Sequence, residues 1–379
     1  MRFETQLIHA GEPRPRPAGA IAMPIYQSST FEPGAAAGYH DLTYIRLNNT
    51  PNHLALHGKL ATLEGGEAAL VTASGMAAIS TTLLAVLSAG DHLLAHDRLY
   101  GGATDLLTKD LPRLGITCTF VDARDPAAWA AHVTPRTRAF YVETLTNPLV
   151  QIPALAEVAR FCRARGLTSI IDNTLATPVL YRPIAHGFDL VVHSATKYLN
   201  GHSDIIAGAL VGARDDAYWA KLRTLRAQLG TILGQTEAWL LMRGMRTLFP
   251  RVAWACRSAE ALAERFAAHP MVAEVLYPGL PGFAGHTVAK AQMTGGFSGM
   301  LSVRVKGGER AAIATAARVA LWKRATSLGG VESLIEHRAS IEGPGTPCPT
   351  DLLRLSVGVE DTGDLFDDLD QALRRAHNA

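Results

Sequence analysis

The sequence predicts an α/β fold with a large, mostly parallel sheet and a smaller α+β region towards the C-terminus. Between about residues 60 and 215, short apolar segments rich in Val, Ile, Leu and aromatic residues alternate with helical patterns. This alternation is typical of parallel strands covered by helices on both faces. The pattern then changes to long helices followed by interleaved strands and helices. With 379 residues, the chain is long enough for more than one domain.

Six apolar segments are expected to form the strands of the first region: 67–73, 91–97, 117–123, 137–144, 168–173 and 188–194. Between two of them, residues 152–167 place apolar side chains on one helical face. Pro153 suits the first turn of that helix, and Gly166 suits its end.

The second region is expected to begin with helices over 235–249 and 251–269, separated at Pro250, which we take as the connection between domains. Further strands are predicted over 272–279, 300–307 and 352–358, and helices over 309–320 and 362–376. We therefore expect three parts, namely an N-terminal arm over 1–52, a cofactor-binding domain over 53–245 and a C-terminal α+β domain over 246–379.

Composition and charge exclude several classes of protein. The formal net charge is +2 and the basic residues are scattered, so no nucleic-acid or anionic membrane surface is expected. The first residues lack the apolar segment of a signal peptide, and the most apolar run, 77–90, is too short to span a membrane. The four cysteines lie far apart, which argues against a disulfide framework and a cysteine zinc site. A cytoplasmic location is expected.

Polar residues follow five of the predicted strands: Ser74-Gly75-Met76, Tyr100, Asn147, Asp172, and the group Ser194, Thr196 and Lys197. In open α/β sheets, ligands bind at the carboxyl ends of the strands, so a single shared site is expected. A Ser-Gly turn that opens a helix presents free N–H groups to a phosphate. A buried aspartate can hold a proton on a heterocyclic nitrogen, and a lysine can form a Schiff base. Together these groups indicate a pyridoxal 5'-phosphate site.

Other sites fit the sequence less well. His53 and His57 are four residues apart, but "HLALH" lacks the glutamate of a zinc-protease motif, so no metal site is expected. The sequence contains no Gly-rich dinucleotide or P-loop motif after a strand.

The segments "SATKYLNGHSD", "SIIDNT", "SGMAA", "YVETLTNP", "YPGL", "SLGGVESLIEH" and "LRLSVGVE" give the chain a specific resemblance to a known family. In order and spacing they resemble the Cys/Met-metabolism enzymes, which have the PLP-dependent transferase fold of type I. This family contains cystathionine γ-synthase, cystathionine γ-lyase, cystathionine β-lyase and methionine γ-lyase. The similarity covers nearly the whole chain.

The resemblance implies a role for each candidate residue. Lys197 would bind the cofactor covalently and later move protons, Asp172 would pair with the ring nitrogen, and Tyr100 would stack on the ring. The phosphate would be held by Ser74, Gly75, Met76, Ser194 and Thr196. The α-carboxylate of a small sulfur amino acid would be bound by Asn147 and Arg354, and the mobile lysine would be tethered by Ser327.

The "YIRLNNTP" segment matches the family's Y-x-R motif. The resemblance therefore implies that Tyr44 and Arg46 reach the cofactor phosphate of a neighbouring subunit, in a dimer that usually pairs into a tetramer. The expected activity is carbon–sulfur elimination at Cβ or Cγ of cystathionine or a related thioether. Alternatives are γ-replacement on an O-acylhomoserine, methionine γ-lyase activity, and a catalytically silent binding protein of the same fold.

The chain departs from the family pattern at several positions. Leu145, Ser298, Gln235 and Glu237 stand where relatives often carry other residues, and we interpret the first two as local backbone matters. The consequential departure is Thr326, where γ-synthases and γ-lyases commonly carry a glutamate that faces the distal end of the substrate. Leu328 stands where β-lyases carry an aromatic residue. These two positions leave the choice between β-elimination, γ-elimination and γ-replacement open.

Overall fold

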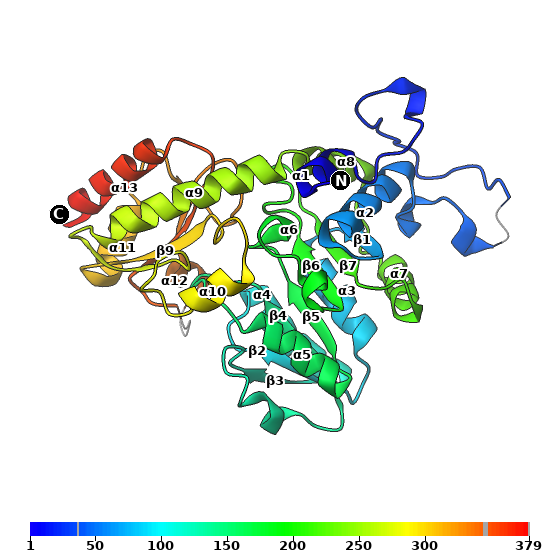
Figure 1. Cartoon of the computed structure of the whole chain (residues 1–379), viewed down its shortest axis with the longest axis horizontal. Coiled ribbons are helices and arrows are strands. Elements are labelled where there is room, and N and C mark those ends of the chain that lie inside the picture. Colours follow the sequence, from blue (N-terminus) through cyan, green and yellow to red (C-terminus); the bar gives the residue numbers. More distant parts are fainter. Residues whose placement is uncertain (36–37, 344–347, 378–379) are drawn as a thin grey trace.

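The larger of two sheets lies in the middle of the molecule. The computed structural model describes residues 1–35, 38–343 and 348–377. In this sheet seven strands follow the order β1-β7-β6-β5-β4-β2-β3 (Figure 1). The strands are β1 (Ala68–Thr72), β2 (His92–His96), β3 (Thr117–Val121), β4 (Thr137–Glu143), β5 (Thr168–Asp172), β6 (Leu190–Ser194) and β7 (Gly208–Gly212). The strands from β6 to β3 pair in parallel, whereas β7 is antiparallel to both its neighbours. All six predicted strands and the mostly parallel sheet are thus confirmed.

Strand β7 was absent from the sequence prediction. It has only five residues and begins and ends with glycine, Gly208 and Gly212, which weakens any strand pattern. Glycine is required at Gly208 because a Cβ there would lie 2.1 Å from the carbonyl oxygen of Ser74. The close approach brings β7 against the end of β1, where the polar residues collect.

Helices cover both faces of the larger sheet. One face packs against α2 (Pro51–Glu64), α5 (Leu155–Arg165) and α8 (Gln235–Met245), and the other against α3 (Gly75–Val86) and α7 (Ala217–Leu229). Alternate strand residues serve the two cores, as Val142 and Tyr141 of β4 show. This period of two explains why the buried strands read as continuous apolar runs.

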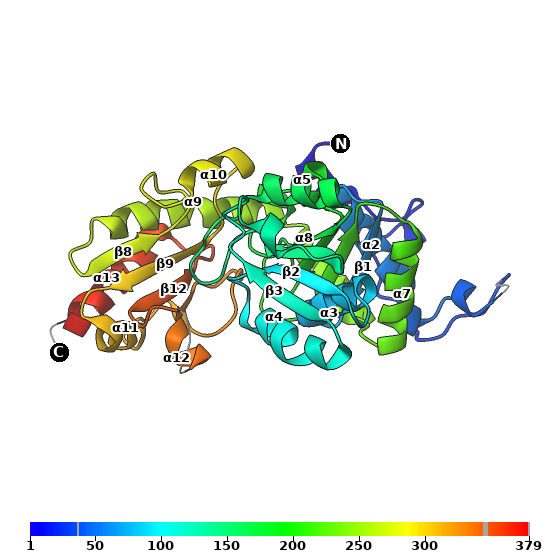
Figure 2. The same cartoon turned by 90° about the horizontal axis from the view of Figure 1, so that it is seen from below.

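The C-terminal part contains the second sheet, in the order β10-β11-β12-β9-β8 (Figure 2). Its strands are β8 (Val272–Leu276), β9 (Met300–Val305), β10 (Lys323–Arg324), β11 (Leu334–His337) and β12 (Leu352–Ser356). A third core joins this sheet to α9 (Leu248–Ala267), α11 (Gly308–Ala316) and α13 (Thr362–His377). The smaller helices are α1 (Phe3–His9), α4 (Gly101–Asp105), α6 (Thr177–Leu180), α10 (His286–Gln292) and α12 (Arg338–Glu342).

Two proline predictions were wrong in detail. Pro250 does not separate two helices: α9 begins at Leu248 and contains Pro250 in its first turn, where a missing N–H breaks no helical hydrogen bond. The break between α8 and α9 falls at Arg246 and Thr247 instead. Pro153 lies before α5, whose first residue is Leu155.

An N-terminal arm leaves the body of the molecule after α1 and returns at α2 (Figure 1). Gln235 of α8 ties it down by donating a hydrogen bond to the carbonyl of Ser28 at 2.8 Å. Large apolar side chains of the arm remain exposed, among them Ile21 at 72% and Tyr39 at 45%. Within the described ranges, no helix combines the length and apolar character needed to cross a membrane.

Candidate active site

The predicted site residues converge at the carboxyl edge of the larger sheet. Strands β1 and β6 point the same way because each is antiparallel to β7, so the residues after them meet at one edge. Gly75 lies directly against Ser194, since a Cβ on Gly75 would come within 2.7 Å of the Ser194 Cβ. A Cβ on Gly102 would likewise lie 2.7 Å from the ring of Tyr100 and 3.0 Å from the sulfur of Met76. Three of the five predicted strand ends are joined by these contacts.

The turn between β1 and α3 has the geometry of an anion site. Ser74 caps α3, with its hydroxyl accepting a hydrogen bond from the N–H of Ala77 at 3.0 Å. The first turn of this 12-residue helix points its backbone N–H groups at the edge of the sheet. Ser194 lies beside this turn, against Gly75. The hydroxyl of Thr196, in contrast, already donates a hydrogen bond to the carbonyl of Ala207 at 3.1 Å.

Asp172 ends β5 with a carboxyl group that is held in place. Its Oδ1 accepts a hydrogen bond from the N–H of Thr174 at 2.9 Å and another from the Thr174 hydroxyl. Burial raises the pKa of Asp172, while the Thr174 hydrogen bonds and the nearby His193 act in the opposite direction. Its orientation is therefore set before any ligand binds.

Glu143 is a site residue that the sequence analysis missed. It pairs in register with Asp172 on the neighbouring strand and accepts a hydrogen bond from the backbone N–H of Tyr100 at 2.6 Å. Burial, and then the charge of Asp172, raise the pKa of Glu143 well above its usual value. The carboxylate at the end of "AFYVE" was the available signal, because it stands at a strand end like the other candidates.

Lys197 follows β6 and contacts the part of the chain that forms the second sheet. Its Nζ donates a hydrogen bond to the hydroxyl of Ser327 at 2.7 Å. Burial and then the charge of Arg354 lower the pKa of Lys197 to about 8. Ser327 has a φ of 85°, a left-handed conformation that is uncommon for a residue with a side chain and is found at functional sites.

Arg354 on β12 contacts residues from both the larger-sheet and the second-sheet parts of the chain. One of its terminal nitrogens lies 2.7 Å from the carbonyl of Ser327 and 2.7 Å from the carboxylate of Glu336, and the other lies 3.3 Å from Oδ1 of Asn147. The side chain is 3% exposed. The prediction that Asn147, Ser327 and Arg354 lie together therefore agrees with the geometry.

The residues present fit pyridoxal phosphate. Its phosphate would be held at the start of α3 beside Ser194, where Gly75 leaves no room for a Cβ and the helix offers free N–H groups. Lys197, with a pKa lowered to about 8, can supply a neutral amine to an aldehyde. The half-buried carboxyl of Asp172 matches a protonated ring nitrogen.

Tyr44 and Arg46 are not brought to this site within the chain. The Arg46 guanidinium lies 5.7 Å from the ring centroid of Tyr44 and 5.5 Å from that of Tyr39. Buried Arg226 holds the base of the arm by donating to the carbonyls of Arg46 at 2.9 Å and Leu47 at 2.7 Å. These contacts hold the arm in place. The expected binding of a neighbouring subunit's cofactor phosphate by Tyr44 and Arg46 stays a prediction.

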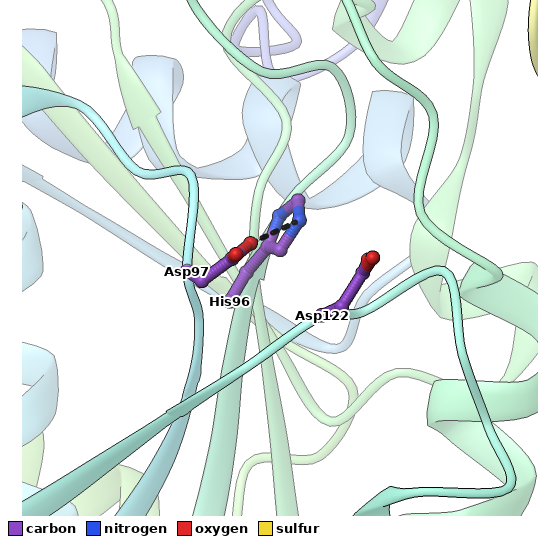
Figure 3. Close-up of side chains that lie close together, drawn as sticks. All are labelled: His96, Asp97 and Asp122. Carbon is purple, nitrogen blue, oxygen red and sulfur yellow. Dashed lines mark ion pairs between the residues drawn. The ribbon is translucent and has the colours of Figure 1, made fainter. Parts of the chain in front are cut away.

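A separate polar cluster lies at the ends of β2 and β3. His96, Asp97 and Asp122 offer ligand atoms within 4.8 Å of one another (Figure 3). However, both oxygens of Asp122 accept hydrogen bonds from Arg124, at 2.9 Å and 2.8 Å. Because a guanidinium already balances this carboxylate, we assign no metal to the cluster.

Fold and site together define a pyridoxal-phosphate-dependent enzyme. A family model described as "Cys/Met metabolism PLP-dependent enzyme" matches residues 4–374. The chain therefore belongs to this family, whose members use pyridoxal phosphate in sulfur amino-acid metabolism.

Individual relatives within the family have different activities. The chain is 44% identical to cystathionine gamma-synthase of Mycobacterium tuberculosis, covering 97% of this chain and 96% of that protein. It is 39% identical to cystathionine gamma-lyase of Bacillus subtilis, covering 98% and 99%. The crystal structure of cystathionine gamma-lyase from Lactobacillus plantarum complexed with L-serine superimposes with a TM-score of 0.93 at 38% identity, over 100% of both chains.

The pH dependence of cofactor uptake tests the environment of Lys197. With a pKa of about 8, roughly a tenth of the amine is neutral at pH 7. We expect the rate at which the apoenzyme and pyridoxal phosphate form a visible absorption band to rise from pH 7 to 9 and then level off. The matched control, Nα-acetyl-lysine, should keep gaining rate beyond pH 10. An apoenzyme rate that also climbs through pH 10 would contradict the lowered pKa.

Proposed function

We propose that this enzyme cleaves the carbon–sulfur bond of cystathionine or a related thioether amino acid by elimination at Cβ or Cγ. The observation that carries the proposal is the contact between the Lys197 amine and the Ser327 hydroxyl at 2.7 Å, beside buried Arg354. This arrangement places a proton carrier next to a binding group for an amino-acid carboxylate.

The substrate's α-carboxylate would bind Arg354 with the help of Asn147. A guanidinium offers two parallel N–H donors, which suit a carboxylate. Glu336 pairs with the same guanidinium from the neighbouring strand β11 and so limits its rotation. Glu336 thus occupies one side of the Arg354 guanidinium. The N–H donors that remain would bind the carboxylate of the substrate.

Lys197 would move the protons of the reaction. When bound, pyridoxal phosphate supplies an electron-withdrawing ring that weakens the substrate's Cα–H bond. The Lys197 amine then takes the proton from Cα, and the hydroxyl of Ser327 limits the positions that Nζ can reach. For elimination at Cγ, the same amine would also carry a proton away from Cβ. Its pKa of about 8 keeps both of its protonation states accessible near neutral pH.

Asp172 and Tyr100 would act on the ring itself. Asp172 would hold the proton of the ring nitrogen, which requires that its carboxyl be ionised. Tyr100 is 43% exposed and its backbone is fixed by Glu143. Its phenol ring would lie over the cofactor and stay close to the departing sulfur.

The neutral side chain of Thr326 supports a related thioether without a distal ammonium as the substrate, in contrast to cystathionine, whose far end carries one. Thr326 is exposed next to Ser327, and it offers no charge to that ammonium. A second candidate is γ-replacement on an O-acylhomoserine. It is favoured by the 44% identity to a cystathionine gamma-synthase.

Product analysis separates these candidates. The holoenzyme is incubated with cystathionine, with methionine, and with O-succinyl- or O-acetylhomoserine plus cysteine. We expect pyruvate or 2-oxobutyrate from cystathionine, which reports elimination at Cβ or Cγ. Formation of a new thioether as the main product would instead establish the transferase, and 2-oxobutyrate from methionine alone would establish a methionine γ-lyase.

We further propose a homodimer that shares its active sites and associates into a tetramer. The exposed apolar side chains of the arm, such as Ile21, support its burial against a second copy of the chain. Arg46 would then bind the cofactor phosphate of the partner subunit.

Thiols without a disulfide at Cys118, Cys162 and Cys256 support a reducing compartment, which we take to be the cytoplasm.

The shared site predicts an effect of Arg46→Ala on cofactor retention. Loss of one charge-assisted hydrogen bond should raise the dissociation constant for pyridoxal phosphate about tenfold. When Arg46→Ala is refolded with Lys197→Ala, half of the dimers are mixed and each contains one intact site. Assayed at a pyridoxal phosphate concentration well below the dissociation constant of Arg46→Ala, where that variant alone is mostly cofactor-free, activity should therefore return to about a quarter of the wild-type value. A mixture no more active than the two separate variants would contradict a site built from two subunits.

A further inference from the structure

Three polar residues form one row across the second sheet. Ser302 of β9 and Glu336 of β11 both pair in register with Arg354 of β12, which lies between them. Residues directly opposite one another in antiparallel strands point to the same face of a sheet. All three residues are at most 5% exposed. Buried polar groups are costly unless they are hydrogen-bonded, so each member of the row needs a partner on the face it occupies.

The partner of Ser302 lies outside the second sheet, next to the active site. Leu301 and Val303, on either side of Ser302, both belong to the third core. Because side chains alternate along a strand, Ser302 points away from that core. Its hydroxyl donates a hydrogen bond to the carbonyl of Pro148 at 2.8 Å, and Pro148 directly follows Asn147. The serine therefore ties the second sheet to the turn that carries Asn147.

Arg354 holds Asn147 from the other side. One terminal nitrogen of Arg354 lies 3.3 Å from Oδ1 of Asn147. A guanidinium only donates hydrogen bonds, so the atom of the carboxamide that faces it must be the oxygen. This orientation leaves the Nδ2 donor of Asn147 for an acceptor such as a carboxylate oxygen. The side chain is thus oriented by Arg354, while the backbone beside it is held by Ser302.

We propose that Ser302 is a positioning residue for Asn147 and so contributes to the selectivity of the site for an α-carboxylate. Its hydroxyl keeps the turn after β4 at a fixed distance from Arg354, so that the carboxamide and the guanidinium can donate to the same carboxylate. Donors of this kind must be held within about 0.5 Å of the productive geometry. This inference rests on the carboxylate-binding role proposed above for Arg354 and Asn147.

Ser302→Ala in the holoenzyme tests the proposal. The probes are L-norvaline and L-norvalinamide, which differ only in having a carboxylate or a carboxamide, and which carry no group that can be eliminated. Their dissociation constants are measured from the change in visible absorption of the bound cofactor. We expect Ser302→Ala to lose about tenfold of the preference for L-norvaline over the amide. A merely structural role would weaken both ligands equally, and an unchanged ratio would overturn the proposal.

A double variant shows whether Ser302 acts through Asn147. Asn147→Ala should lose at least as much of the preference as Ser302→Ala. Adding Ser302→Ala to Asn147→Ala should then change the ratio by less than about twofold. Losses that simply multiply would contradict the proposed route. Ser302→Cys fills nearly the same space with a weaker donor, and it should show a smaller loss in the same direction.

Two controls separate this inference from the proposed function. Ser258→Ala is matched to Ser302→Ala, since Ser258 is a buried serine of α9 whose hydroxyl bonds that of Thr362 at 2.8 Å. It should leave the ratio within about twofold of the wild type. Arg354→Met should abolish the preference, and if it does not, the proposed carboxylate site is wrong and the role of Ser302 with it. If Arg354→Met abolishes the preference but Ser302→Ala retains it, only the role of Ser302 is overturned.

Discussion

Lys197→Ala should lower turnover about 10⁵-fold, because one substitution removes both the covalent attachment of the cofactor and the carrier of the Cα proton. The amine that is lost is the group that Ser327 holds at 2.7 Å. Turnover is measured by release of keto acid under saturating substrate and cofactor. Thermal unfolding of the variant establishes that it folds.

Two further observations make this expectation specific. Lys221→Ala, an exposed lysine of α7, is the matched control and should retain wild-type turnover. Borohydride treatment of the wild-type holoenzyme should add the mass of reduced cofactor to the peptide that contains Lys197. Near-wild-type turnover of Lys197→Ala, or labelling of a different lysine, would refute its role.

Asp172→Asn should reduce kcat/KM about 10³-fold while the enzyme still binds its cofactor. The amide keeps the size of the carboxyl group, but it cannot stabilise a positive charge on the ring nitrogen. The proton on that nitrogen is what makes the ring an electron acceptor. Steady-state kinetics with the substrate identified by product analysis provide the measurement.

The control for this substitution is Asp189→Asn. Asp189 precedes β6 and accepts hydrogen bonds from Ser169 through its N–H at 2.9 Å and its hydroxyl at 2.7 Å, at the opposite end of the strand from Lys197. It should affect thermal stability more than kcat/KM. If the two variants lose the same fraction of kcat/KM, the effect of Asp172→Asn is a general effect of removing a carboxylate that is hydrogen-bonded next to a strand.

Local patterns in the sequence were sufficient to predict a cofactor site. Asp172 and Lys197 each follow an apolar strand at the point where polar residues begin. Parallel strands bring such ends to one edge, so the pattern along the chain already implies proximity in space. Ser298 has a φ of 78°, a left-handed conformation that favours glycine, which agrees with the interpretation of this position as a local backbone matter.

Several features could not be predicted because they depend on contacts between distant segments. Glu143 stands at a strand end like the other candidates, but its pairing with Asp172 depends on the register between two strands, which one strand alone does not reveal. Glu64 is the last residue of α2, and its contact with His193 requires α2 to pack on one particular face of the sheet. Strand β7 was missed because the glycines at its two ends weaken the apolar pattern by which a strand is recognised.

The sequence by itself determined the class of cofactor and the α/β architecture, and it predicted which lysine binds the cofactor, because these depend on residue type and on periodicity over short distances. Only the tertiary structure decided how Lys197, Ser327 and Arg354 meet. Lys197 follows a strand of the larger sheet, whereas Ser327 and Arg354 lie in the part of the chain that forms the second sheet, and contacts at 2.7 Å join them. The packing of the second sheet against the edge of the first creates that meeting point. The same packing lowers the pKa of Lys197 to about 8, through burial and the neighbouring guanidinium.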